Sequence, residues 1–531
     1  MKSKLEEDNT MKKYTIATLL FKRRRKMTKF IMKINYFSIV FIGLAFLSSC
    51  ATTQELKKPK YATKTPAGIN APAEVKTRLG TLRTKDGFPD KATLEKVFDN
   101  LDFQRGVQSV LTAMPAASLA AMRRGHRKIG PDNQTVLQFP THMDSRTLFL
   151  TPNTAAIYNF IWLNTKEGPL VIDVPPQGLG AIDNFWFHWV GDVGETGPDK
   201  GKGGKYLLLP PGYKGKVPEG YHVLHSPTYN HWFFLRVFGK PEAAVASVKK
   251  NLRIYPLAKA ANPPKMNFVN LSGKNLNTIG AIDFSYFEDV NTVVQEEPNA
   301  AMDSETLGLL ASIGIEKGKQ FKPDARMKKI LTEAAAVGAI TARALAYKSR
   351  IPESYFYKNS AWGTPFIGGS YEFLKEKGVR DLDARTYFFF YATGITPAMA
   401  MKMIGKGSAY AAAFVDAKGD PLDGGKTYKI HLPPNIPAKQ FWSFVLYSSQ
   451  TRSMLQTDQQ FPSTGSLKKG IVINADKSVD VYFGPKAPAG MENNWVQTVP
   501  GKGWNVLFRL YGPLKPWFDK TWRPGEFELV K

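Results

Sequence analysis

The sequence predicts a mixed α+β protein, mainly β, in which two β-rich regions flank a helical middle. Two stretches, 147–238 and about 411–531, hold short β-branched or aromatic runs divided by turn residues such as Gly, Pro and Asn, and such runs are typical of β-sandwiches and barrels. Between them, apolar residues recur at helical spacing behind capping residues. A chain of 531 residues exceeds what one hydrophobic core usually serves, so we expect several domains.

Shifts in composition divide the chain into five expected segments. They are an N-terminal extension with a lipoprotein signal peptide (1–50), a flexible tether (51–79), N-terminal helices with a β-sandwich (80–240), a helical middle region (241–405) and a C-terminal β-sandwich (406–531). The tether is rich in Lys, Pro, Thr and Ala and lacks periodicity, which is typical of flexible linkers.

The stretch Met27–Cys50 has the pattern of an export signal that ends in a lipid-attachment site. Lys29 and Lys33 form a basic front, and the uncharged core Phe37–Leu47 has the length of a signal-peptide core rather than of a spanning helix. Leu47-Ser48-Ser49-Cys50 then has the form of a bacterial lipobox, and Cys50 is the only cysteine of the chain. We therefore predict lipidation at Cys50.

This signal predicts an exported protein of the bacterial cell envelope, held at a membrane by its lipid. Ala51 and Thr52 follow the cysteine without an Asp, which favours the outer membrane. The alternative, an uncleaved signal anchor, would bury Lys33 and Asn35 in the bilayer at high cost. Because a signal normally begins a chain, translation is expected to start at Met27 or Met32.

The chain is strongly basic, with a net charge of +27. Such charge in an exported protein can meet anionic lipid or polyanionic envelope sugars, although scattered lysines mainly indicate a solvated surface. No nucleic-acid-binding module is recognisable, so we expect no nucleic-acid partner. With a single cysteine there are no disulfides, and stability must come from packing.

Helices are expected at both ends of the first β region. Asp90 can cap a helix that carries Leu94, Val97, Phe98 and Leu101 on one face and continues to Pro115, and a further piece ends near Arg124-Gly125. In the middle region we expect helices at Ser304–Ile313 behind Asp303, at Asp324–Tyr347, and after Thr396-Pro397.

Strands are expected in two groups. The first comprises 158–162, 170–174, 185–189, 205–209 and 231–236, and the second comprises 427–432, 440–447, 471–473, 479–483 and 505–511. Asn474–Ser478 would form a turn between two strands of the second group.

Several strings of residues resemble a bacterial family that combines two domains of unknown function, numbered 1254 and 1214. They include Thr147–Asn153, Gly197–Gly201, Gly203–Leu207, Leu310–Ile315, Ala392–Pro397, Phe441–Ser443, Asn494-Trp495 and Arg509–Tyr511. The resemblance runs from about Thr81 to the C-terminus. It implies an immunoglobulin-like N-terminal sandwich, a jelly-roll-like C-terminal sandwich and helices between them. It implies no catalytic residues.

The chain also departs from this family at two places. Relatives commonly resemble Asn-Thr-Asp-Thr where this chain has Asn153-Thr154-Ala155-Ala156, and they often carry Arg at the position of His188. A chemical role of that Asp or Arg in relatives would therefore not carry over.

The scarce histidines suggest possible metal or acid/base chemistry. His222, His225 and His231 could hold zinc and leave a fourth position for an attacking water, although residues three apart on a strand point to opposite faces. His142 and Asp144 would share one side of a strand as an acid/base or ligand pair, and His188 is a further candidate. The alternative for each is a surface or packing histidine.

Nucleotide binding and serine or thiol hydrolysis find no support. The stretch Gly419–Thr427 has one residue too many for a phosphate-binding loop and leads into a strand, and Gly197–Gly204 lacks dinucleotide-binding spacing. No Gly-x-Ser-x-Gly elbow occurs.

The last region combines aromatic and polar residues. We predict a ligand groove, for a glycan or another small molecule, from Trp442, Arg452, Asp458, Asn494, Trp495 and Arg509. The alternative is that the tryptophans, with Trp504, Trp517 and Trp522, fill the core. Three functional hypotheses follow: an envelope-anchored protein that binds an envelope or environmental ligand, a metal-assisted or acid/base hydrolase, and a structural envelope protein that acts as a homo-oligomer.

Overall fold

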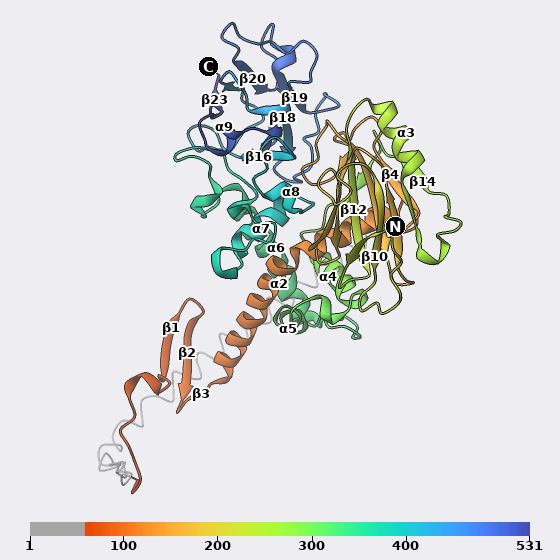
Figure 1. The fold of residues 1–531 in the computed structure, drawn as a ribbon. Coiled ribbons are helices and arrows are strands. Elements are labelled where there is room, and N and C mark those ends of the chain that lie inside the picture. The colour runs from red at the N-terminus through yellow and green to blue at the C-terminus, as the bar shows by residue number, and fades with distance from the viewer. Residues whose placement is uncertain (1–58, 531) are drawn as a thin grey trace, which may run out of the picture. The chain divides into compact units, whose positions relative to one another are not determined.

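The computed structural model describes residues 59–530, so Cys50 and its signal lie outside the described residues. The chain divides into two compact units. The small one ends at Glu74 and includes Thr84–Phe88, and the large one holds Val75–Arg83 and everything from Pro89 onward. About 27% of the chain is helix and 27% is strand, so the expected mixed α+β class is confirmed (Figure 1). The expected predominance of strand was wrong, because helix and strand are equally abundant.

Short elements begin the described chain. They are the 3-10 helix η1 (Ala67–Ile69) and strands β1 (Glu74–Thr77), β2 (Gly80–Lys85) and β3 (Phe88–Pro89). Strand β1 lies inside the stretch that we expected to be wholly flexible tether.

Helix α2 (Lys91–Arg127) is the longest element and begins where the sequence predicts, because the Asp90 carboxylate accepts the Thr93 N–H at 2.7 Å. The expected break at Pro115 was wrong: one continuous helix passes through it. Residues 113–122 of this helix are buried throughout, so packing offsets the lost backbone donor. Gly125 does not cap the helix but permits close packing, since a Cβ there would lie 2.7 Å from the Asn277 carbonyl oxygen.

The first β region consists mainly of two sheets. The six-stranded sheet has the order β14-β4-β6-β12-β8-β9, and the four-stranded sheet has the order β11-β10-β7-β13. Their strands are β4 (Thr135–Gln138), β6 (Ile157–Asn164), β7 (Leu170–Val174), β8 (Gly178–Asn184), β9 (Trp189–Gly194), β10 (Gly204–Leu209), β11 (His222–His225), β12 (Asn230–Val237), β13 (Arg253–Pro256) and β14 (Asn267–Asn270). A two-stranded pair, β5 (Thr147–Leu148) with β15 (Leu276–Asn277), stands beside them.

Two expectations for this region were wrong. Residues 185–188 form a turn between β8 and β9, and only Trp189 of the expected strand lies in β9. The turn forms because the Asn184 side chain accepts the N–H groups of Trp186 and His188, and Phe187 adopts a φ of +61°. Strands β13, β14 and β15 also lie beyond residue 240, inside the expected helical middle. These strands pair with strands from much earlier in the chain, and the order of elements along the sequence does not predict such pairing.

The second β region repeats the plan with two four-stranded sheets, β16-β22-β18-β19 and β21-β20-β17-β23. Their strands are β16 (Ser408–Ala413), β17 (Tyr428–Leu432), β18 (Ala438–Ser448), β19 (Ser463–Gly465), β20 (Val479–Gly484), β21 (Trp495–Gln497), β22 (Trp504–Pro513) and β23 (Glu528–Leu529). A shared apolar core joins the two sheets. The expected strand at 471–473 does not form, whereas Asn474–Ser478 does turn into β20.

The remaining helices are mostly in the middle of the chain. They are α3 (Pro241–Asn251), α4 (Ser285–Glu296), α5 (Ser304–Ala311), α6 (Ala325–Tyr347), α7 (Leu382–Tyr391), α8 (Pro397–Ala400) and α9 (Lys515–Phe518). The caps expected at Asp303 and Thr396 both form, and Asp324, expected to begin its helix, caps α6 instead. Short 3-10 turns occur at Leu257–Lys259, Asn299–Ala301, Pro352–Ser354, Ile367–Gly369, Glu376–Gly378 and Glu492–Asn494.

Helix α6 is the one helix within residues 59–530 that is long and apolar enough to cross a membrane. Half of its apolar window is buried in the protein, where α6 packs against α2 and α7. This burial is what a core helix shows, and it offers no separate evidence for a span.

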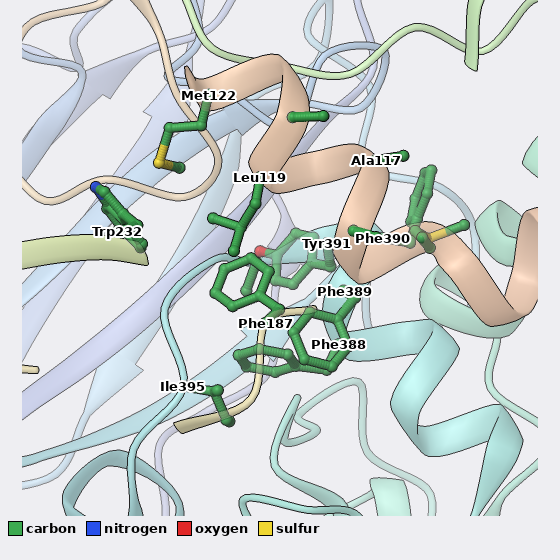
Figure 2. Packing of buried hydrophobic residues seen from close by; sticks show 14 of the residues in the cluster. Ala117, Leu119, Met122, Phe187, Trp232, Phe388, Phe389, Phe390, Tyr391 and Ile395 are labelled. Carbon is green, nitrogen blue, oxygen red and sulfur yellow. The ribbon is translucent and has the colours of Figure 1, made fainter. Parts of the chain in front are cut away.

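A central core joins the helices to both β regions. Each region turns one face of a sheet toward its own core and the other face toward this centre: Phe160 and Trp232 come from the first region, and Val445 and Leu507 from the second. Figure 2 shows the meeting point, with Leu119 of α2 near Trp232 of β12 and the aromatic run Phe388–Tyr391 of α7. The cavity described next opens in this layer.

Candidate functional site

The first cavity lies between the inward faces of the two β regions. The space between its lining atoms is about 590 Å³ up to open solvent, and water centres can occupy about 60 Å³ of it, so it is narrow. Its walls come from β6, β12, β16, β22, α7, α8 and the segment 149–153. These elements are far apart in the sequence and meet only in the folded protein.

Eight of the nineteen residues that line the cavity are aromatic. Phe149 stacks on Phe160 with ring centroids 5.0 Å apart, and Trp232 lies 4.6 Å from Phe234 on the same strand face. Phe366 and Phe388 contribute a third pair at 4.9 Å. Rings of this kind favour a flat or apolar ligand body.

Arg509 of β22 is the first of two charged groups in this wall and is only 3% exposed. Its guanidinium donates to the Tyr447 hydroxyl at 2.6 Å and to the Thr151 carbonyl at 2.7 Å. Burial disfavours its charge, and the pKa of Arg509 is nevertheless raised because the tyrosines around it would favour that charge once they ionise at high pH. At neutral pH these tyrosines are uncharged and offer hydrogen bonds alone. Within residues 59–530, no carboxylate forms an ion pair with Arg509.

Arg236 of β12 is the second charged group and is 7% exposed. It follows Trp232 and Phe234 at two-residue spacing, which puts all three side chains on the same sheet face. The Tyr410 hydroxyl lies beside its guanidinium and favours its charge, and its Nε is buried without a partner. Arg236 likewise has no ion pair with any described carboxylate.

Asp192 is a partly buried acid near Arg236. Burial raises the pKa of its carboxyl group, and the charge of Arg236 offsets part of that rise. Its carboxylate accepts the Trp189 indole N–H at 3.0 Å and forms no ion pair with Arg236. A small neighbouring cavity of about 290 Å³ shares Phe234, Arg236 and Met399 with the lining of the main cavity.

The predicted histidine metal site does not assemble. His222 and His225 lie on β11, at the edge of the four-stranded sheet, whereas His231 is fully buried on β12 of the other sheet. No group of three or more His, Cys, Asp or Glu side chains that could hold a metal gathers within the part of the chain that the structure describes.

The predicted His142–Asp144 pair does not form either, because these residues lie in a turn and coil rather than a strand. His142 has a φ of +69° and faces Phe461, with ring centroids 6.4 Å apart. The Asp144 carboxylate pairs with Arg146. His188 is exposed in the β8–β9 turn. None of the three borders the first cavity.

The six residues of the predicted C-terminal groove are dispersed. Trp442 lies in the sandwich core, the Asn494 amide is held by Val472 and Asp480 backbone groups, and the Trp495 indole donates to the Gly484 carbonyl. Asp458 is exposed and pairs with Gln497. Trp504, Trp517 and Trp522 also fill the core.

Arg452 and Arg509 of that set do border cavities, but two different ones. The sequence reasoning missed Arg236 altogether. One signal in the sequence could have revealed it. Arg236 continues the alternation of Trp232 and Phe234 along a strand of apolar residues, so a single cation stands at a position where an apolar side chain is expected.

The fold and this cavity define a protein with two β regions around a helical core. Comparison with known protein families adds two matches within these β regions. Residues 133–256 match the family described as "Protein of unknown function (DUF1254)", and residues 407–515 match "Protein of unknown function (DUF1214)". The combination and order expected from the resemblance are thereby confirmed. A search of curated proteins found no match.

Solved structures resemble the chain at low identity. The VPA0106 protein from Vibrio parahaemolyticus has a TM-score of 0.50 and 18% identity, over 81% of this chain and 100% of that one. An uncharacterized protein from Burkholderia cenocepacia has a TM-score of 0.40 and 12% identity, over 82% and 96%. The first of these supports the fold alone.

Proposed function

We propose that this protein is an exported, lipid-anchored binding protein of the bacterial envelope, and that its first cavity binds a small acid with an aromatic or apolar body. One observation carries the proposal: Arg236 and Arg509 are buried beside an aromatic cavity without a carboxylate partner within residues 59–530. We also propose that the protein is located at the cell envelope, that its first β region is an immunoglobulin-like sandwich and that its second is a jelly-roll-like sandwich.

The reason is the cost of a buried charge. A guanidinium removed from water without a counter-ion loses several kcal/mol of hydration, which neutral acceptors restore only in part. Arg keeps its proton throughout the physiological pH range, so it cannot escape this cost by becoming neutral. An incoming carboxylate would supply paired, charge-assisted hydrogen bonds.

The aromatic walls select the rest of the ligand. Phe160, Trp232 and Phe388 can contact an aromatic or aliphatic body while the acid group meets the arginines. A neutral sugar would leave both guanidinium charges unpaired, so this cavity favours an acid over the glycan that the sequence suggested. The narrow interior favours a ligand of about a dozen heavy atoms or fewer.

The test is a matched pair of ligands with the full chain in lipid nanodiscs. Titration calorimetry would compare 3-phenylpropionate with its amide, which has the same shape and no charge. We expect saturable binding of the acid, at least tenfold weaker binding of the amide, and loss of acid binding in Arg236→Met. Arg326→Met, a substitution of an exposed arginine paired with Asp99 and Asp102, is the control and should bind normally.

Two results would contradict the proposal. Equal affinity for acid and amide would show that the arginines do not recognise charge, and normal binding in Arg236→Met would place the site elsewhere. Product analysis of the same incubations also tests the hydrolase hypothesis, using the corresponding ester as substrate. The size of the complex on a calibrated column tests the homo-oligomer hypothesis.

A further inference from the structure

A second cavity lies among the helices. Its walls come from α2, α6 and α7 with the loop Gly280–Ile282. The space between its lining atoms is about 490 Å³ up to open solvent, and water centres can occupy about 40 Å³ of it, so it is narrow like the first cavity. The lining is almost wholly apolar and includes Met114, Ala117, Ala339, Phe389 and Phe390. Figure 2 shows Ala117 and Phe390 side by side in this wall.

Arg452 is the one charged side chain in the lining of this second cavity. It is 6% exposed, and its guanidinium lies over the Phe390 ring at 4.3 Å. Its Nη1 donates to the Gln450 carbonyl at 3.2 Å, while its Nε is buried without a partner. Within residues 59–530 it forms no ion pair with a carboxylate.

The two cavities are separate but share a wall. Leu150 lines both of them. The next residue links the two arginines: the Thr151 N–H donates to the Arg452 carbonyl at 3.0 Å, and the Thr151 carbonyl accepts from Arg509 at 2.7 Å. One short segment therefore divides two apolar spaces, each of which holds buried arginine without a counter-ion.

We propose that the second cavity is a binding site of its own for a short aliphatic carboxylic acid. Arg452 pairs with the carboxylate, and the alanine, methionine and phenylalanine side chains of the three helices enclose the alkyl chain. Small lining residues such as Ala117 and Ala339 leave a narrow space that suits an unbranched chain better than a ring. The site uses a different arginine and different aromatic rings from the first cavity and shares only Leu150 with it, so it does not rest on the function proposed there.

The experiment measures stoichiometry with hexanoate, which is short enough to stay largely in water, and with neutral hexanamide as its isostere. Calorimetry with the full chain in nanodiscs, against empty nanodiscs, would be run on wild type, Arg452→Met, Arg236→Met and the double variant. Hexanoate can enter either cavity, so we expect two binding events in wild type, one in each single variant and none in the double variant. Hexanamide should bind at least tenfold more weakly at each site.

A second variant separates a lost site from a damaged fold. Ala339→Leu adds three carbons to the cavity wall and leaves Arg452 unchanged, so it should abolish the second event alone. A chain that binds one hexanoate, lost in Arg236→Met and unchanged in Arg452→Met, would overturn the second site and leave the first intact. A single event lost in both single variants would mean one shared ligand and would also overturn it. A wild-type chain that binds one hexanoate, lost in Arg452→Met and unchanged in Arg236→Met, would support the second site and contradict the first.

Discussion

Two buried arginines lie near opposite ends of strand β12 and have opposite environments. Arg123 of α2 is 5% exposed and meets the first residue of the strand, Asn230, at 3.4 Å. Its guanidinium forms a two-pronged pair with Glu296 and lies over the Phe185 ring at 4.5 Å. Arg236, near the other end of β12, is equally buried but has only the Tyr410 hydroxyl.

The difference separates a charge that holds the fold from a charge kept for a ligand. Four arginines are buried within residues 59–530, and only Arg123 has a carboxylate. The other three, Arg236, Arg452 and Arg509, all line one of two apolar cavities. If burial alone explained these arginines, the unpaired ones would be scattered through the core.

The largest expected effect comes from removing the paired arginine. Arg123→Met leaves Glu296 without its partner and removes the ring contact with Phe185. We expect a loss of about 2–3 kcal/mol of unfolding free energy, below the 3–5 kcal/mol of a fully buried pair because Glu296 is 35% exposed on its side chain. Urea unfolding followed by circular dichroism measures this. An unchanged free energy of unfolding would mean that the Arg123–Glu296 pair does not stabilise the fold.

Removing an unpaired arginine should have the opposite sign. Arg236→Met keeps most of the side-chain volume and removes a buried charge, so the empty protein should gain about 1–3 kcal/mol of unfolding free energy. The same denaturant series measures it. A loss of stability in Arg236→Met would show that Arg236 is structural, like Arg123, and would break the comparison.

A buried acid sharpens the comparison, because an acid can discard its charge. Asp183 is fully buried, accepts the Ile395 N–H at 3.1 Å and has a second oxygen without a partner. Burial raises its pKa well above 3.8. Its folded-state pKa exceeds the unfolded one, so its contribution to stability is complete below about pH 3.8 and is lost as pH rises through the folded pKa.

Asp183→Asn therefore removes a pH-dependent penalty. At pH 7 the variant should be more stable than wild type, and the gain should vanish near pH 3.8, where Asp183 is protonated in both the folded and the unfolded chain. Urea midpoints at a series of pH values measure it. A gain that does not change with pH would place its origin in packing rather than in the proton. Arg236 has no such escape, which is why an unpaired arginine points to a ligand more strongly than an unpaired aspartate.

Local signals in the sequence predicted much of the fold and little of the site. Capping carboxylates such as Asp90 and Asp324 act within three residues, and the aromatic strand runs carry their own period, so both could be recognised. The sheet partners of β13 and β14 depend on contacts far along the chain and could not. The cavity is of this second kind, since Arg236 and Arg509 are 273 positions apart and only the packing of two β regions brings them to one space.

The smallest expected effect concerns the one neutral partner of Arg236. Tyr410→Phe removes the hydroxyl that lies beside Arg236 and favours its charge, which should lower stability by about 0.5–1.5 kcal/mol. The same change removes a polar group that competes with the ligand for the guanidinium, so acid binding should tighten about two- to threefold, or roughly 0.5 kcal/mol. Calorimetry with 3-phenylpropionate measures this, and Tyr447→Phe, which removes the partner of Arg509 instead, is its companion. Weaker binding in Tyr410→Phe would mean that the hydroxyl contacts the ligand itself, whereas tighter binding together with lower stability is the combination expected of a placeholder for an absent anion.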